Sequence, residues 1–276
     1  MEDTCDATST TRSYTVNGGV QLNQTQSLHS LVFDNGYITN ELRVDPLTLR
    51  QARTVRNASI SHVLPTRFQE PQMFRVIAID EHVAVELGMN PSLLDLGTLR
   101  LQVLGEVPAT KAPSLYWPFA HNYGGYQFGQ WAGQLGDGRA VSLGVVRVQR
   151  RTMGEETCTV ENTPEDWWEL SLKGSGRTPY SRSGDGRAVL ASLGREYLGA
   201  VALNGIGVPA VRALTLVGTT QQNDKDAIWR DEFYNGNVRA RAPGVLLRVA
   251  PSFLRLGSLQ LAAINQGFSG TVQLTR

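Results

Sequence analysis

The stretch YQFGQWAGQLGDGRA, residues 126–140, is rich in glycine and ends beside an arginine. Two of its glycines flank Asp137, and Arg139 follows the second of them directly. Glycine adopts backbone conformations closed to other residues and lets a phosphate approach peptide N–H groups, while a guanidinium offers that phosphate charge-assisted donors. The stretch therefore indicates a nucleotide-binding loop. The alternative is a tight hairpin between two strands, which is the commoner structure for a Gly-rich loop taken alone.

Regular elements surround this stretch in a definite order. Before it, Asp80 is a candidate N-cap for a short helix within 79–89 that Gly88 ends. After it, two strands, a strongly periodic helix and two further strands are predicted from apolar alternation and helical spacing. The strands are residues 141–150, 168–173, 213–217 and 245–249, and the helix runs from Val189 to Gly205. The connections are the acidic, solvated 155–166, the Gly-rich 174–186 and the polar 218–241.

One lysine and one glutamate occupy positions in this order of elements that are informative about function. In the small lobe of a protein kinase, a glycine loop covers the ATP phosphates and a strand lysine pairs with a helix glutamate. Lys173 ends the second strand here, and Glu196 lies three residues after Leu193, beside the apolar stripe of the helix. The alternative is a strand-end lysine in solvent and a glutamate on a solvated helix face. The order of the elements makes these two interpretations equally good.

Four long blocks resemble the signature blocks of the selenoprotein O family, whose bacterial members are also called YdiU. They are FDNGYITNELRVDP (33–46), YWPFAHNYGGYQFGQWAGQLGDGRAVSLG (116–144), LKGSGRTPYSRSGDGRAVL (172–190) and LLRVAPSFLRLGS (246–258). The resemblance extends from about Leu31 to Leu261, and blocks of this length are far more specific than a G-x-G pattern.

The resemblance implies an α+β fold, namely a kinase-like small lobe made of an antiparallel sheet and a C-type helix. It also implies ATP bound in an inverted pose, with Mg²⁺ or Mn²⁺, and transfer of AMP to Ser, Thr or Tyr hydroxyls of protein substrates. The chemistry needs charge neutralisation and orientation at the α-phosphate, which arginines and a divalent metal supply. The roles implied are Gly136, Gly138 and Arg139 in the glycine loop, Lys173 on a phosphate, Glu196 orienting Lys173, Asp185 and Gly186 on the nucleotide, and Arg248 and Arg255 on phosphates.

Each of these residues has an ordinary alternative. Asp185 and Gly186 suit a turn and an N-cap for the following helix, which is compatible with a nucleotide contact. Arg248, inside the apolar run VLLRVA, either extends from a sheet edge to water or meets a buried anion, and its placement favours the anion. Arg255 taken alone is a solvated cation. Four nearby ring side chains are assigned to core or turn packing with no catalytic role: Trp117, His121, Tyr123 and Tyr126.

The sequence departs from the family at its C-terminal end. The family's catalytic aspartate and metal-binding asparagine and aspartate lie beyond the block that ends near Leu261. Residues 262–276 do not resemble that continuation, and Gln260 stands where an acidic residue is usual. We therefore expect no metal ligand, no general base and no large lobe in this chain, and a truncated member of doubtful activity. The alternative function is a non-catalytic nucleotide-binding or regulatory module.

Composition bounds the remaining function classes. The 276 residues are 41% hydrophobic and 18% charged, as in ordinary soluble globular proteins. The formal charge of +1 gives no bias toward nucleic acid or an anionic membrane, and no apolar run approaches the roughly 20 residues that span a bilayer. Two cysteines and four scattered histidines indicate neither a disulfide framework nor a zinc site.

These observations divide the chain into four parts. We expect a disordered leader over 1–30, an N-terminal family extension over 31–115, a kinase-like nucleotide-binding lobe over 116–261 and a divergent tail over 262–276. The leader lacks both an apolar signal core and the Arg-rich, acid-poor composition of a presequence. The resemblance allows a mitochondrial or a cytoplasmic protein, and it leaves the oligomeric state open.

Overall fold

The computed structural model describes residues 42, 44–45, 59–63, 68–91, 94, 118–149, 165–220, 225–231 and 234–264. The predicted leader, Trp117 and nearly all of the block at 33–46 lie outside these residues. Within them a mainly antiparallel sheet is accompanied by few helices, which confirms the α+β class.

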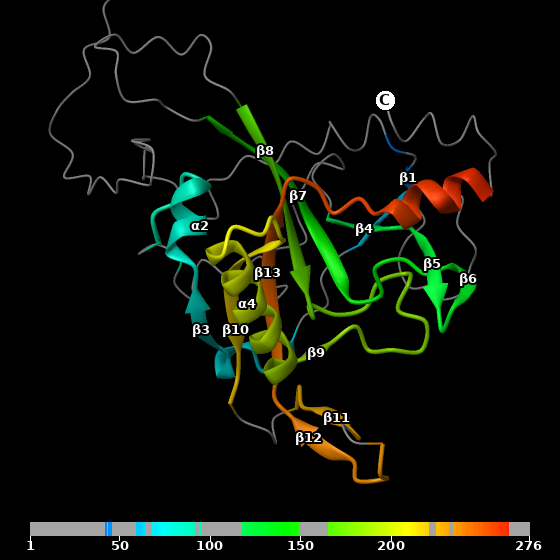
Figure 1. Ribbon diagram of the computed structural model, residues 1–276. Helices are drawn as coiled ribbons and strands as arrows, with labels where there is room; N and C mark the ends of the chain where they lie inside the picture. Colours follow the sequence, from blue (N-terminus) through cyan, green and yellow to red (C-terminus); the bar gives the residue numbers. More distant parts are fainter. Residues whose placement is uncertain are drawn as a thin grey trace, which may run out of the picture.

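One nine-stranded sheet organises the described residues, in the order β1-β2-β4-β7-β8-β13-β10-β3, with β9 paired to β13 (Figure 1). All its pairings are antiparallel except that of β1 with β2. Its strands are β1 (Val44–Asp45), β2 (Ile60–His62), β3 (Arg75–Ile79), β4 (Phe119–His121), β7 (Ala140–Gln149), β8 (Glu165–Lys173), β9 (Ala188–Val189), β10 (Arg212–Gly218) and β13 (Pro243–Ala250).

Two separate hairpins and a few helices complete the fold. The hairpins are β5 (Gly124–Gln127) with β6 (Gln130–Gln134), and β11 (Ile228–Arg230) with β12 (Arg239–Arg241). The helices are η2 (Pro71–Met73), α2 (Glu81–Glu86), α4 (Leu190–Gly205) and a helix over 256–264, drawn in orange-red in Figure 1.

Alternation along the central strands gives the sheet two different faces. Leu170 and Leu172 of β8 are fully buried in the largest apolar core, which also contains Phe74 and Leu87. Successive side chains of a strand point to opposite faces, and directly opposite residues of paired strands share a face. Because Arg248 lies opposite Ser171, it joins the polar side chains on the other face. These side chains are Glu169, Ser171 and Lys173 of β8 and Arg248 of β13.

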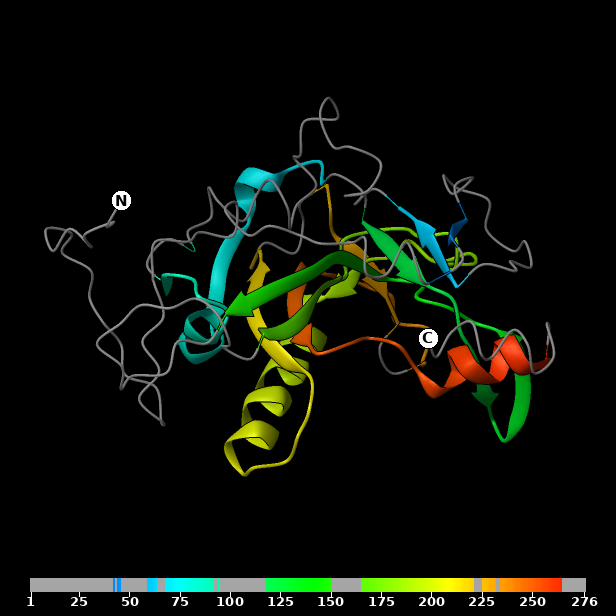
Figure 2. The same ribbon diagram turned by 90° about the horizontal axis from the view of Figure 1, so that it is seen from above.

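The two principal helices form where the sequence predicts them. The Asp80 carboxylate accepts a hydrogen bond from the Val83 amide at 3.1 Å, which caps α2, and Gly88 follows the helix with a φ of 73°. The helix α4 packs on the sheet (Figure 2), and its Leu193 belongs to the buried apolar cluster that contains Leu216 and Leu246. Both helix predictions are confirmed.

The buried stripe of α4 is narrower than the apolar spacing suggests. Leu198 and Val201 are 67% and 42% exposed, because the helix turns only its Leu190, Leu193 and Tyr197 side toward β10 and β13. Figure 2 shows α4 projecting from one face of the sheet. Apolar spacing identifies the helix but does not show which part of its surface the sheet covers.

Two connections differ from their predictions. The strand β8 begins at Glu165, so the last two residues of the predicted acidic connection belong to a strand, because β8 pairs with β7 as far as Gln149. The polar loop 218–241 contains β11 and β12, which form their own two-stranded sheet. Its polar composition gives no alternation from which this hairpin could be predicted.

Candidate functional site

The Gly-rich stretch divides into two parts with different structures. Its first part forms the β5–β6 hairpin, whose turn residues Phe128 and Gly129 have φ values of 52° and 78°. Positive φ at both central residues is typical of a tight hairpin turn. The hairpin alternative is therefore right for this part. The second part, residues 135–139, is a loop that leads into β7 and lines a cavity.

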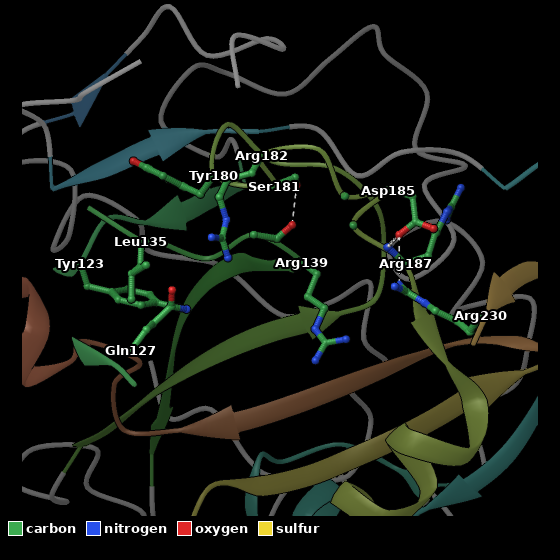
Figure 3. A pocket seen from close by; sticks show the side chains of 14 residues that line it. Tyr123, Gln127, Leu135, Arg139, Tyr180, Ser181, Arg182, Asp185, Arg187 and Arg230 are labelled. Atoms are coloured by element: carbon green, nitrogen blue, oxygen red, sulfur yellow. Dashed lines mark hydrogen bonds and ion pairs between the residues drawn. The ribbon is translucent and has the colours of Figure 1, made fainter. Parts of the chain in front are cut away.

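This cavity has a volume of about 300 Å³ and lies between the loop at 135–139 and the loop at 180–187 (Figure 3). Arg230 of the β11–β12 hairpin also reaches it. Two loops from distant parts of the sequence thus meet around one space. Five predicted nucleotide contacts line it: Gly136, Gly138, Arg139, Asp185 and Gly186.

The described lining of the cavity is strongly cationic. Four arginines contribute to it, Arg139, Arg182, Arg187 and Arg230, and Asp185 is the one carboxylate among the described lining residues. The Arg230 guanidinium lies 3.7 Å from Asp185, with both side chains about half exposed. A cavity lined by one sign of charge concentrates ligands of the opposite sign. The described lining therefore suits an anion.

The glycines of both loops have a packing role that the sequence did not reveal. A Cβ atom on Gly136 would lie 2.3 Å from the Tyr180 ring, and one on Gly186 would lie 2.0 Å from the Gly176 carbonyl oxygen. Both glycines also have positive φ, 79° and 71°. The Ser181 hydroxyl donates to the Gly138 carbonyl across the same contact. Glycine is thus required at 136 for the two loops to pack together and at 186 for the second loop to fold on itself, whatever ligand enters between them.

Asp185 shapes its own loop. Its carboxylate accepts a hydrogen bond from the Arg187 amide at 2.9 Å, which is the turn that the sequence suggested. The suggested N-cap is wrong, because the N-cap residue of α4 is Val189 and has no side-chain capping bond. The β9 strand, Ala188–Val189, intervenes and pairs with β13 before the helix begins.

Lys173 and Glu196 are brought together on the polar face of the sheet. The Lys173 ammonium donates to Glu196 Oε2, and the other carboxylate oxygen lies 3.6 Å from Nη1 of Arg248. Their side chains are 22% and 31% exposed, so neither is the solvated surface residue of the alternative interpretation. The amide of Gly174 donates to the Arg139 carbonyl at 2.9 Å, which joins this cluster to the cavity wall.

Arg248 is a buried cation, and one of its hydrogen-bond donors is not satisfied by the described residues. Its Nη2 donates to the Ser171 hydroxyl at 3.0 Å, and its guanidinium lies 4.9 Å from the centre of the Phe253 ring. Its Nε is buried and has no hydrogen-bond partner among the described residues, and burial lowers the pKa of the group. Since β13 lies between β8 and β10, Arg248 does not extend from a sheet edge. An under-compensated buried guanidinium is a natural receptor for an anion.

Arg255 contacts one residue of the glycine loop and one residue of the cavity wall. Its Nη2 lies 3.6 Å from Asp137 Oδ1, and its guanidinium stacks 4.6 Å from the centre of the Tyr123 ring. Burial and the nearby Asp137 charge raise the pKa of Tyr123 to about 12. Because Tyr123 also lines the cavity, Arg255 is partnered at the cavity wall. Its side chain is nevertheless 47% exposed, so Arg255 is both partnered and partly solvated.

A buried ion pair beside these residues was not predicted. His121 Nε2 lies 2.7 Å from Glu169 Oε1, and each side chain is 1% exposed. Burial by itself lowers the pKa of His121 and raises that of Glu169, but the opposite charge and hydrogen bond outweigh it. The His121 pKa is therefore raised and the Glu169 pKa lowered. His121 is indeed packed in the interior, as the sequence indicated. The available signal for the pair was the alternation that places Glu169 on the face of Lys173.

The described part of the chain contains neither a cluster of metal-binding side chains nor a membrane-spanning helix. Among those residues, no group of three or more His, Cys, Asp or Glu side chains is placed to hold a metal ion. No helix among them is long and apolar enough to cross a membrane.

Sequence relatives agree with the family resemblance. Residues 47–276 match the family described as Protein adenylyltransferase SelO. A "Protein nucleotidyltransferase YdiU" of Tolumonas auensis is 45% identical over 85% of this chain and 40% of its own length. A protein of the same name from Xanthomonas campestris is 43% identical over 89% of this chain and 41% of its own. The "Protein adenylyltransferase SelO-1, mitochondrial" of Danio rerio is 38% identical over 91% and 34%. The chain thus spans about 40% of the length of these bacterial relatives.

Proposed function

This chain belongs to the protein adenylyltransferase SelO family, and we propose that it binds ATP in the cationic cavity between its two Gly-rich loops. We further propose that the protein transfers AMP from ATP to Ser, Thr or Tyr hydroxyls of protein substrates. The names of the relatives, nucleotidyltransferase and adenylyltransferase, support this reaction class.

One observation carries the proposal. Five residues assigned to the nucleotide from the sequence line a single cavity of about 300 Å³, although they come from loops about 50 residues apart. The ion pair of Lys173 with Glu196 and the buried guanidinium of Arg248 are not part of this described lining. They are connected to it through the hydrogen bond from the Gly174 amide to the Arg139 carbonyl. A triphosphate needs several fixed cations close together, and this is their arrangement on the polar face of the sheet.

The side chains have distinct roles in the proposed reaction. The substrate hydroxyl oxygen forms a bond to the α-phosphorus and releases its proton to solvent. The bond from that phosphorus to the bridging oxygen breaks, and pyrophosphate leaves with the electron pair. Lys173, held by Glu196, stabilises negative charge on the phosphates. Arg248, which shares the Glu196 carboxylate with Lys173, and Arg255 bind the phosphates through charge-assisted hydrogen bonds. Arg139 completes the cationic wall at the glycine loop.

A divalent cation, when bound, neutralises phosphate charge in such reactions. The described residues do not provide a donor set for it. The carboxylates of this region are engaged by cations, Glu196 by Lys173 and Arg248, and Asp137 by Arg255.

The proposal includes a kinase-like arrangement of the nucleotide-binding part. A strand lysine paired with a glutamate of α4, next to a glycine loop, is the small-lobe pattern of protein kinases. The proposed lobe at 116–261 shares its sheet with strands of the proposed extension at 31–115, because β2 pairs with β4 and β3 pairs with β10.

Labelled ATP tests this function. Incubated with Mg²⁺ or Mn²⁺ and a protein acceptor, label in the α-phosphate is expected to become covalently attached to protein hydroxyls, whereas label in the γ-phosphate is not. Lys173→Ala should abolish the labelling. Arg212→Ala should retain it, since Arg212 pairs with Glu86 at 2.9 Å and is not one of the cations assigned to the phosphates.

The other outcomes of this experiment identify other functions. Label from the γ-phosphate alone would indicate phosphoryl transfer and contradict the proposal. Absence of label, combined with ATP binding that depends on Lys173, would identify the chain as a non-catalytic nucleotide-binding module.

A further inference from the structure

The segment 251–255 joins β13, which carries the proposed phosphate ligand Arg248, to the helix at 256–264, and it ends at the second proposed ligand, Arg255. Its chain path therefore decides how these two guanidinium groups stand relative to each other. The segment has no regular secondary structure beyond a bend, so side-chain contacts must hold it in place. The contacts of the buried Glu169 carboxylate do this.

Glu169 uses both of its carboxylate oxygens. Oε1 lies 2.7 Å from His121 Nε2, and Oε2 accepts a hydrogen bond from the Phe253 amide at 2.8 Å. The carboxylate thus ties β8, β4 and the segment 251–255 together in a place that water does not reach. A buried carboxylate forms hydrogen bonds about twice as strong as neutral ones, so this anchor is a firm one.

Two branches lead from this anchor to the two arginines. Through Phe253, the first branch reaches Arg248, whose guanidinium lies 4.9 Å from the centre of the Phe253 ring. Through His121, the second branch reaches Asp137, because the His121 amide donates to Asp137 Oδ2 at 3.4 Å. The other oxygen of Asp137 lies 3.6 Å from Nη2 of Arg255.

We propose that the Glu169–His121 pair is a positioning element that sets Arg248 and Arg255 at the spacing required to bind a polyphosphate. This inference rests on the proposed function, since it assigns a purpose to the two arginines. Neither Glu169 nor His121 touches the ligand. Each acts through the residues that it holds.

Stability alone gives no sufficient reason for the pair. A buried ion pair commonly contributes no more to stability than well-packed apolar residues of the same volume. Here the pair instead supplies an acceptor for the Phe253 amide and fixes the His121 backbone beside Asp137. An apolar pair would fill the same space without making the hydrogen bond to Phe253.

Substitutions of Glu169 are expected to change the positions of the two arginines more than the net charge near them. The Glu169 charge is what holds the His121 pKa above its usual value, against the effect of burial. When Glu169 is neutralised, the buried imidazole is therefore expected to lose its proton. The net charge of the pair is then unchanged, so a loss of phosphate affinity reflects the displaced arginines.

A graded series of full-chain variants tests the proposal. Glu169→Gln keeps a carbonyl acceptor for Phe253 but removes the charge, and the double variant His121→Phe with Glu169→Leu removes both polar partners and keeps an apolar filling. Glu86→Gln is the control, because it breaks the ion pair of α2 with β10. Each variant is measured for affinity toward ATP, adenosine and inorganic tripolyphosphate, and for hydrogen exchange of the Phe253 amide.

The expected result separates positioning from folding. The double variant should bind ATP and tripolyphosphate about tenfold more weakly or worse, which corresponds to 1.4 kcal/mol, with unchanged adenosine affinity and faster exchange at Phe253. Glu169→Gln should lie between it and the unmodified chain, and Glu86→Gln should match the unmodified chain. If Glu169→Gln does not fold, the double variant carries the test.

Failure of this inference differs from failure of the proposed function. Unchanged ATP and tripolyphosphate affinity in the double variant, or an equal loss for adenosine, would overturn the positioning role. An unmodified chain that binds tripolyphosphate but neither ATP nor adenosine would contradict the proposed function alone. A chain that binds none of the three ligands would overturn both.

Discussion

Replacing Arg248 with methionine is expected to weaken nucleotide binding without destabilising the fold. Methionine has a flexible apolar side chain of similar length and leaves the central strand β13 intact. Nucleotide affinity should fall because Arg248 is proposed to bind the phosphates. Stability should not fall, because without a ligand the contacts of Arg248 do no more than offset the cost of burying its charge. Replacing a side chain with a mainly structural role would instead lower both the nucleotide affinity and the stability of the fold.

The magnitude follows from the contacts of Arg248. Removing a guanidinium from water costs several kcal/mol. Against this cost stand one hydrogen bond to Ser171, about 1 kcal/mol, an ion pair with Glu196 at 3.6 Å, at most about 1 kcal/mol, and stacking on Phe253, about 0.5–2 kcal/mol. These contributions offset the cost without exceeding it. Because Glu196 keeps Lys173 as a partner when Arg248 is removed, no unpaired charge is left. Arg248→Met should therefore leave the free energy of unfolding unchanged or raise it by up to about 2 kcal/mol.

Denaturant unfolding and ATP titration of the same preparation measure the two effects. The urea midpoint should stay or rise, and the ATP affinity should fall about tenfold to a hundredfold, the value of one or two charge-assisted hydrogen bonds. Arg212→Met serves as the control and should lower the midpoint slightly while leaving ATP affinity unchanged. A loss of more than about 2 kcal/mol of stability in Arg248→Met would contradict the poor compensation of Arg248, and an unchanged ATP affinity would contradict its proposed role in binding phosphate.

Three further predictions concern other contacts. Gly136→Ala should lower the free energy of unfolding by about 2 kcal/mol or more, because its Cβ meets Tyr180 at positive φ, whereas Gly199→Ala in α4 should raise it by up to about 1 kcal/mol; thermal melts that rank the two variants the other way would contradict this. The His121–Glu169 pair should contribute fully to stability between about pH 4.5 and 6.5. The part due to Glu169 is lost as pH falls through its lowered pKa, and the part due to His121 is lost as pH rises through its raised pKa; the urea midpoint of the His121→Phe, Glu169→Leu double variant should lack both losses, and an unchanged pH profile would exclude the pair as their source. Tyr123 should ionise near pH 12 in an ultraviolet titration, and a spectrum in which Tyr123→Phe removes a tyrosine of ordinary pKa would contradict its buried position beside Asp137.

Local sequence patterns predicted the elements that carry the site. The spacing of Leu190, Leu193 and Tyr197 identified α4, and the position of Lys173 at the end of a strand is correct. These predictions succeed because helical and strand periods depend on neighbouring residues. The same patterns place Glu196 near the sheet, where it meets Lys173.

Contacts between distant segments could not be predicted in the same way. The glycines at 136 and 186 were attributed to a ligand, but Tyr180 and Gly176 fill the space beside them. The partner of Glu169 is His121, 48 residues away, and only the pairing of β4, β7 and β8 brings them together. Such contacts depend on which strands are neighbours in the sheet, and a single sequence gives little direct information about that order.

Calorimetric titration of ATP into the unmodified chain, the Lys173→Ala, Arg248→Met double variant and Arg212→Met is the most decisive experiment on the proposed nucleotide site. We expect one ATP site in the unmodified chain and in Arg212→Met, and affinity reduced by about a hundredfold or more in the double variant, since two cations next to the phosphates are lost. Equal ATP affinity in all three proteins would show that the nucleotide does not bind beside Lys173 and Arg248, and the proposed site would then be wrong.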